Sequence, residues 1–313
     1  MRQLLSTRRE FDFMGRRRPA MILSGILIVV SLLSLVFRGL AFGIDFTGGT
    51  LVEVGYPEPV PLETVRKVLA ENGFEEAQVQ QFGTPKDLLI RLAPREGVKA
   101  SELSDRVFAA LSKAADGRVE LRRVEFVGPQ VGDELTEDGA LAVLVALMAI
   151  LMYVAVRFEW RFAVGSVAAL VHDVVLTLGF FSITQLEFDL TVLAAVLAVI
   201  GYSLNDTIVV FDRIRENFRK IRKGDSETII NVSLNQTLSR TLVTSLTTLL
   251  VLLALFFLGG EIIHNFSLAL ILGVVVGTYS SIYVASTTAL ALGVSKADLM
   301  PVEKEGARLD DMP

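Results

Sequence analysis

The chain has 313 residues, of which 52% are hydrophobic and 21% are charged, and its formal net charge is −5. It contains no cysteine and only two histidines, which excludes a disulfide scaffold and thiol chemistry and argues against a multi-histidine metal site. Long apolar runs separated by clusters of charge are typical of a membrane protein with a soluble part. The sequence predicts neither a metal site nor a cofactor.

Residues 1–18 form a basic N-terminus that is predicted to stay in the cytoplasm, because six arginines stand there against two acids. The apolar run that follows, Pro19–Phe37, is long enough to cross a bilayer. We therefore interpret residues 19–38 as a first membrane helix and not as a cleaved signal peptide. Pro19 suits the first helical turn, where its missing N–H is no loss.

Residues 39–136 predict a small soluble domain. Its glycine-rich start, Gly39–Thr50, lacks the lysine and the spacing of a phosphate-binding loop, so a turn or a packed connection is expected there. The predicted elements are a strand at Gly49–Tyr56, a helix at Leu62–Asn72, strands at Ala77–Phe82 and Asp87–Leu92, a helix at Ser101–Ala115 with Ser101 as its N-cap, and a strand at Val119–Val127. This βαββαβ order is that of the ferredoxin-like α+β fold.

Residues 137–292 hold five further apolar runs, so that six membrane helices are predicted in all. The additional spans are Gly139–Val156, Phe162–Leu186, Leu190–Phe211, Thr241–Gly260 and Phe266–Leu292. Lysine and arginine gather in the N-terminus and in residues 157–161 and 212–223, and they are absent from 185–189 and 261–265. The positive-inside rule then places both termini in the cytoplasm and the soluble domain outside it. In the cytoplasmic tail, 293–313, the polar residues from Ser295 onward are predicted to be disordered.

Asp206 interrupts the fourth span. A carboxylate in hydrocarbon is costly unless it is neutralised, paired or wetted, and such residues commonly have a function. Arg240 opens the fifth span at the same cytoplasmic end. An acid and a guanidinium at similar depth can pair, and protonation of the acid would weaken that pair, as a proton relay requires. The alternatives are that Asp206 only fixes the helix bundle and that Arg240 only extends its charge to the cytoplasmic surface.

Asp173 lies in the third span, about 16 Å from its start and thus near the middle of the bilayer. Its neighbour His172 points to a helix face about 100° away, so the two need not act together. Polar side chains near these groups are expected to support a proton path, and they are Ser203, Asn205, Thr207 and Thr244.

The sixth span contains Gly273–Gly277, followed by Thr278, Ser280 and Ser281. Small residues at this spacing allow helices to approach closely. We interpret the stretch as a packing surface.

The sequence does not predict an enzyme, because it has no nucleotide-binding loop, nucleophile elbow or metal-ligand cluster. An intramembrane aspartyl protease would explain aspartates on consecutive spans, but GYSLND at residues 201–206 lacks the glycine–X–glycine–aspartate pattern of those enzymes. Small-molecule efflux is a further alternative, although one small domain offers little room for a pocket of about 300–1,000 Å³. The mildly acidic surface of residues 40–136, with sixteen acids and eleven bases, argues against nucleic acid binding.

Four segments of the chain resemble the signature segments of the SecF family. They are GIDFTGGT at 43–50, LVHDVVLTLG at 170–179, IGYSLNDTIVVFDRIRENFRKIRKG at 200–224 and SLNQTLSRTLVTSLTT at 233–248. SecF is the smaller subunit of the bacterial SecDF protein-export complex. The resemblance extends from the first span to the sixth, and it implies half of a resistance-nodulation-division type transporter with a periplasmic domain between the first two spans.

The resemblance also implies a function and a location. A protein of this family is expected in the inner membrane, using the proton-motive force to promote late-stage protein export through the SecYEG channel. The implied partners are SecD, SecYEG, YajC, the translocating preprotein and membrane lipid. The family's proton-path residues fall on Asp206 and Arg240, with Asp173 as a third position. The alternative is a structural assembly or chain-binding subunit without ion conduction of its own.

Overall fold

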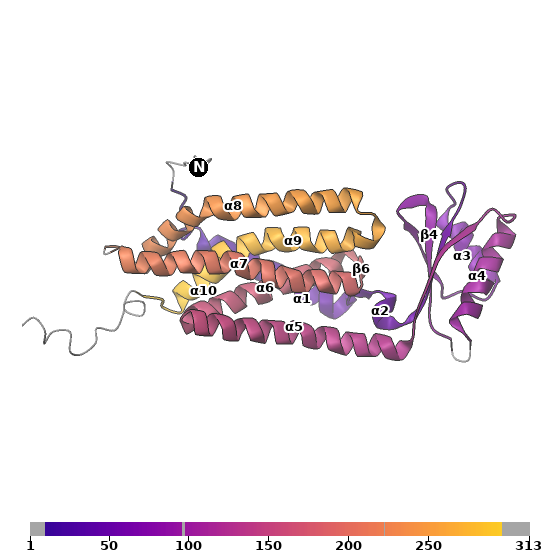
Figure 1. Ribbon diagram of the computed structural model, residues 1–313, viewed down its shortest axis with the longest axis horizontal. Coiled ribbons are helices and arrows are strands. Elements are labelled where there is room, and N and C mark those ends of the chain that lie inside the picture. The colour runs from indigo at the N-terminus through magenta and orange to yellow at the C-terminus, as the bar shows by residue number, and fades with distance from the viewer. Residues whose placement is uncertain (1–9, 96–97, 222, 296–313) are drawn as a thin grey trace, which may run out of the picture.

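The computed structural model describes residues 10–95, 98–221 and 223–295, and the structural statements below concern these ranges. The molecule is elongated, with long helices side by side and a small α/β domain at one end of the bundle (Figure 1). The start of the basic N-terminus and the polar tail, including its predicted disorder, lie outside the described residues.

Six spans are long and apolar enough to cross a membrane in the described part of the chain, as the hydropathy pattern predicts. They are α1 (Arg17–Arg38), α5 (Pro129–Arg157), α6 (Trp160–Thr184), α7 (Leu190–Lys220), α8 (Ser226–Leu258) and a sixth span composed of α9 (His264–Ser280), a π-helical turn (Ser281–Ala285) and α10 (Ser286–Ala291). Most of α6 is buried among the other helices, whereas α1, α5 and α8 expose apolar side chains. The centre of the bundle is therefore formed by α6, α7 and the sixth span.

Three helices extend beyond the apolar runs that predict them. α5 begins at Pro129 and not at Gly139, α7 continues past Phe211 to Lys220, and α8 begins at Ser226 and not at Thr241. Hydropathy detects only the lipid-soluble part of a helix, while its ends depend on capping. At the start of α8 the Asp225 carboxylate accepts a hydrogen bond from the Thr228 N–H at 3.0 Å.

The soluble domain contains one antiparallel sheet of four strands, in the order β3-β4-β2-β5. The strands are β2 (Gly49–Gly55), β3 (Gln78–Phe82), β4 (Thr84–Leu92) and β5 (Glu120–Val127), and the helices are α3 (Leu62–Glu71) and α4 (Ala100–Ala114). Val52 and Ile90 pair across β2 and β4 and are fully buried together with Leu69 of α3 and Leu111 of α4. The predicted N-cap at Ser101 is wrong, because α4 begins at Ala100 after Lys99 and has no side-chain cap.

The glycine-rich connection between α1 and the sheet is structured. It contains β1 (Ala41–Phe42) and the short helix α2 (Ile44–Thr47). β1 pairs in parallel with β6 (Glu187–Phe188), which lies in the turn between α6 and α7. A side chain at Gly49 would place its Cβ 2.6 Å from the Leu92 carbonyl oxygen, and the φ angle of Gly49 is +134°. Glycine is required at position 49, because the backbone at the start of β2 passes directly against the end of β4.

Candidate functional site

Three helical segments meet at the carboxylate of Asp206. Thr241 of α8 donates its hydroxyl to one carboxylate oxygen at 2.8 Å, and Ser281 of the π-helical turn donates to the other at 2.7 Å. Asp206 itself is only partly buried. The carboxylate is thus held by neutral hydroxyl groups, which can donate to it when it is ionised and accept from it when it is protonated.

Arg240 directly precedes Thr241, the α8 residue that donates to Asp206. The described residues contain no ion pair between Arg240 and Asp206, and Arg240 is exposed. Asn205 and Thr244 are exposed as well. We call Asn205, Asp206, Arg240 and Thr244 the outward polar face of α7 and α8.

Asp173 of α6 is fully buried, and its carboxylate makes three polar contacts. His172 contacts one carboxylate oxygen through Nδ1 at 2.9 Å, while Ser203 of α7 and Ser280 of α9 donate to the other at 2.5 and 2.7 Å. The sequence interpretation did not require His172 and Asp173 to act together, because their side chains leave the helix about 100° apart. The imidazole nevertheless reaches its neighbour, because Nδ1 lies close to the backbone of its own residue.

The four polar residues predicted to support a proton path lie in different environments. Ser203 binds Asp173. Thr207 is buried, and its hydroxyl has no hydrogen-bond partner in the described part of the chain. Sequence reasoning missed Thr241, Ser280 and Ser281 as ligands of the two carboxylates. Serine pairs in membrane helices usually indicate close packing, so only their proximity to two acids, which the fold creates, reveals this role.

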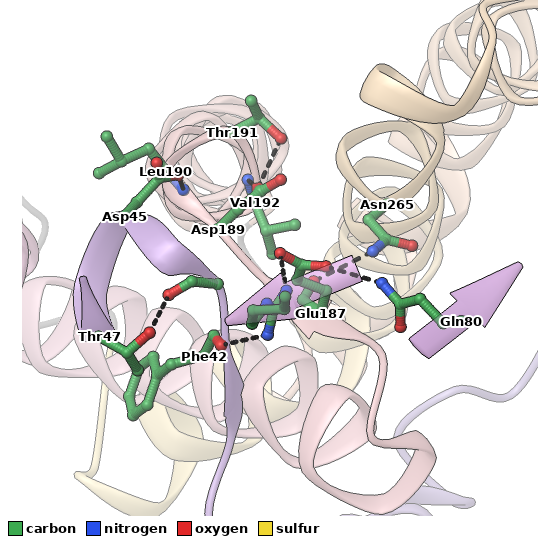
Figure 2. A network of polar contacts seen from close by, with 12 residues as sticks. Phe42, Asp45, Thr47, Gln80, Glu187, Asp189, Leu190, Thr191, Val192 and Asn265 are labelled. Atoms are coloured by element: carbon green, nitrogen blue, oxygen red, sulfur yellow. Dashed lines mark hydrogen bonds and ion pairs between the residues drawn. The ribbon is translucent and has the colours of Figure 1, made fainter. Parts of the chain in front are cut away.

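A second polar cluster, the junction network, connects the soluble domain to the membrane helices (Figure 2). Its members are Phe42, Asp45, Gln80, Arg91, Glu187, Asp189 and Asn265. Arg91 of β4 forms an ion pair with Glu187 of β6 and also donates to the Phe42 carbonyl at 3.1 Å. Asn265 of α9 donates to the Glu187 carbonyl at 3.1 Å.

The same network caps the start of α7. The Asp45 carboxylate accepts from the Leu190 N–H at 3.0 Å, and the Asp189 carboxylate accepts from the Val192 N–H at 2.8 Å. Two acids from distant parts of the sequence thus satisfy free N–H groups at one helix N-terminus, where the helix dipole favours negative charge. The network therefore joins α2 and the turn that carries β6 to the start of α7, the helix that carries Asp206.

We expect Arg91→Gln to destabilise the protein more than Glu187→Gln at neutral pH. Burial raises the pKa of Glu187, and Arg91 opposes this effect. Without Arg91 the partly buried carboxylate has no cation, which should cost about 2 kcal/mol, between the values for exposed and buried pairs. Glu187→Gln removes the charge that needs the cation.

The pH dependence of this effect has a definite sign. An acid with a raised folded-state pKa contributes stability below its unfolded value, and that contribution is lost as pH rises through the folded value. Acidification to about pH 5 should therefore restore much of the stability of Arg91→Gln, because Glu187 is then increasingly protonated. Thermal unfolding in mild detergent at about pH 7.5 and about pH 5 measures the difference. Equal losses at both pH values would contradict it.

The described residues contain no group of three or more His, Asp or Glu side chains placed to hold a metal ion. What the geometry provides is one fully buried and one partly buried carboxylate on neighbouring helices, each bonded by hydroxyl groups from other helices. Such an arrangement can hold or release protons without covalent chemistry.

Comparisons with known proteins identify the family. Residues 107–295 match the C-terminal family model described as protein export membrane protein SecD/SecF, and residues 33–59 match the SecD/SecF GG motif. The protein translocase subunit SecF of Vibrio alginolyticus is 54% identical over the full length of both chains. That of Escherichia coli O157:H7 is 47% identical over 97% of this chain and 95% of its own.

The fold comparison agrees. The crystal structure of SecDF from Thermus thermophilus, described as a translocon-associated membrane protein, superposes with a TM-score of 0.82 and 42% identity. The match covers 92% of this chain and 39% of that one, so this chain spans well under half of the SecDF chain. The relatives are named as translocase subunits, which is a transport role. The chain is a multi-pass membrane protein that belongs to the SecF family of protein translocase subunits.

Proposed function

We propose that this chain is the SecF subunit of a SecDF complex that uses the proton-motive force to promote late-stage protein export through SecYEG. The observation that carries the proposal is the Asp206 carboxylate, which lies within a membrane span, is bound by the hydroxyls of Thr241 and Ser281, and has the charge of Arg240 nearby. Asp206 is the proton-binding group, Arg240 is its cation, and Asp173 is a second carboxyl on the path.

Water can reach the periplasmic end of α7 in this arrangement. An open cleft of about 620 Å³ lies between the sheet of the soluble domain and the start of α7, and Glu53, Asp189 and His264 line part of it. Acidic walls concentrate cations, protons among them, at this end of the helix. Asp206 lies further along the same helix, toward its cytoplasmic end.

The outward polar face supports SecD as the partner. Lipid tails cannot satisfy the exposed side chains of Asn205 and Arg240 within a membrane span. A second membrane subunit that covers α7 and α8 there would do so, and the remaining length of the SecDF chain matched above has room for one. SecYEG, YajC, the preprotein and membrane lipid are the further partners that family membership suggests.

The proposal includes the topology. We assign residues 39–136 to a periplasmic ferredoxin-like domain, supported by the sheet order β3-β4-β2-β5 and by the βαββαβ order of the elements. Residues 19–38 and 137–292 form the membrane part. The arginines of residues 1–18 and the basic segment that follows Asp212 support the assignment of both termini to the cytoplasm and of the chain to an inner membrane.

A flux measurement tests the proposal. Vesicles that contain the purified SecDF complex and an entrapped pH-sensitive dye should acidify or alkalise in the direction of an imposed pH gradient faster than protein-free vesicles. Export of a preprotein into vesicles that contain SecYEG as well as the SecDF complex should be stimulated by that gradient. Stimulated export without any protein-dependent flux would replace this proposal with that of a structural, chain-binding subunit.

A further inference from the structure

Two adjacent serines of the sixth span bind the carboxylates of two different helices. Ser280 donates to Asp173 on α6 and Ser281 donates to Asp206 on α7, each at 2.7 Å. Both serines are completely buried. Neighbouring residues on a helix point about 100° apart, so one short segment can face both helices at once.

Each serine hydroxyl also has a second acceptor in its own helix. Ser280 lies 3.1 Å from the Gly277 carbonyl oxygen, and Ser281 lies 3.0 Å from that of Thr278. A hydroxyl has one proton to donate and two lone pairs with which to accept. When the carboxylate is ionised the serine donates to it. When the carboxyl is protonated it can donate to the serine oxygen, and the serine proton then turns to the helix carbonyl.

The serines lie where the helix changes its geometry. α9 ends at Ser280, and the π-helical turn begins at Ser281. The Ser281 carbonyl oxygen accepts the hydroxyl of Ser286 at 3.2 Å. π-helical turns are rare, and they occur mostly as single turns at functional positions. A serine proton that turns away from its carboxyl therefore bonds a backbone carbonyl close to the point where the sixth span departs from regular helix.

We propose that Ser280 and Ser281 form a hydroxyl switch that couples the protonation of Asp173 to that of Asp206. The serines are positioning residues, because they act through the two carboxyls and through the backbone that joins them. The proposal rests on the proposed function, since it assigns cooperation to the carboxyls of the same proton path.

Few charged or titratable groups face this cluster in the described residues. They are Arg240 from α8, His172 from α6, Tyr279 from α9, whose ring stacks on that of His172 at 6.1 Å, and Tyr283 of the π-helical turn, 5.3 Å from the Tyr279 ring. Tyr202 of α7 precedes Ser203, and its buried hydroxyl has no hydrogen-bond partner among the described residues. From α1, Ser24 contributes a hydroxyl bonded to Tyr279 at 3.0 Å. The apolar runs 19–37 and 139–156 contain no charged residue. The serines are the hydrogen-bonded route between the two acids, beside the shared helix α7 and the direct interaction of the two charges through space.

Infrared difference spectroscopy of the full complex in lipid nanodiscs tests the switch, with the pH stepped and the carboxyl bands followed. Asp206→Asn and Asp173→Asn assign the two bands.

Ser280→Ala removes a donor that contacts Asp173 and not Asp206. We expect Ser280→Ala to shift the titration midpoints of both carboxyl bands. The Asp206 midpoint should move by about half a pH unit, which corresponds to the loss of part of one hydrogen bond. Ser280→Thr keeps the hydroxyl and should restore both midpoints.

Ser267→Ala is the matched control. Ser267 is fully buried in the same span and bonds the Ile263 carbonyl of its own helix at 2.7 Å, so both bands should stay unchanged. A shift of the Asp173 band alone in Ser280→Ala would overturn the switch and leave the proposed function intact. Failure of the Asp206 band to titrate in the unaltered complex would overturn both.

Discussion

Asp206→Asn is expected to abolish proton flux and proton-driven stimulation of export while leaving the complex assembled. Asparagine keeps the size of the side chain and can bond the hydroxyls of Thr241 and Ser281, but it cannot bind or release a proton. Removal of a group that transfers a proton commonly costs about 100-fold or more in rate. Dye-reported flux in vesicles and preprotein export with and without a pH gradient measure the loss.

Asp212→Asn provides the matched control for this prediction. Asp212 lies on the same helix, is exposed, and forms a surface ion pair with Arg157 at 3.6 Å. Exposed pairs contribute little, so flux and export should remain near normal. Copurification of Asp206→Asn with its partner subunit shows that the complex is intact. Normal flux in assembled Asp206→Asn would remove this residue from the mechanism.

The sequence identified Asp206 and Asp173 for one physical reason. An acid within an apolar run is costly, and that cost makes it conspicuous. Serine and threonine carry no comparable cost in a membrane helix, because each can bond a carbonyl of its own helix, as Thr177 does with Asp173 at 2.8 Å. Ser280 and Ser281 therefore read as packing residues, and only the fold shows which acids they contact.

The junction network was unpredictable for a different reason. Arg91 and Glu187 are ordinary charges in a strand and a turn, and the sequence does not show that β4 and β6 meet. The fold brings them together by pairing β1 with β6 and by placing β4 against the same end of the bundle (Figure 2). Helix and strand periodicity found the elements of the domain in order, whereas contacts between elements follow from packing that a single sequence does not display.

Arg240→Ala is expected to lower proton flux by about tenfold or more, with Arg240→Lys affected less. In the proposed mechanism the guanidinium is the cation for Asp206, and it precedes Thr241, which binds that carboxylate, although the described residues contain no ion pair between Arg240 and Asp206. Without a nearby cation the carboxylate form is disfavoured within the membrane, so release of the proton limits each cycle. Lysine keeps the charge but lacks the planar, multiply donating group of arginine.

Because Arg240 is exposed, its effect on proton flux can be separated from an effect on the stability of the helix bundle. An exposed side chain supports little of the internal packing, so Arg240→Ala should fold and should unfold thermally within a few degrees of the unaltered protein. Arg213→Gln is the control, because Arg213 pairs with Glu216 at 2.7 Å in the polar extension of α7. If Arg240 only anchors the helix at the membrane surface, lysine should replace it fully and Arg240→Ala should lose partner binding together with flux. If Arg240 is the cation for Asp206, flux falls in a complex that still assembles, and a steeper imposed pH gradient recovers only part of it.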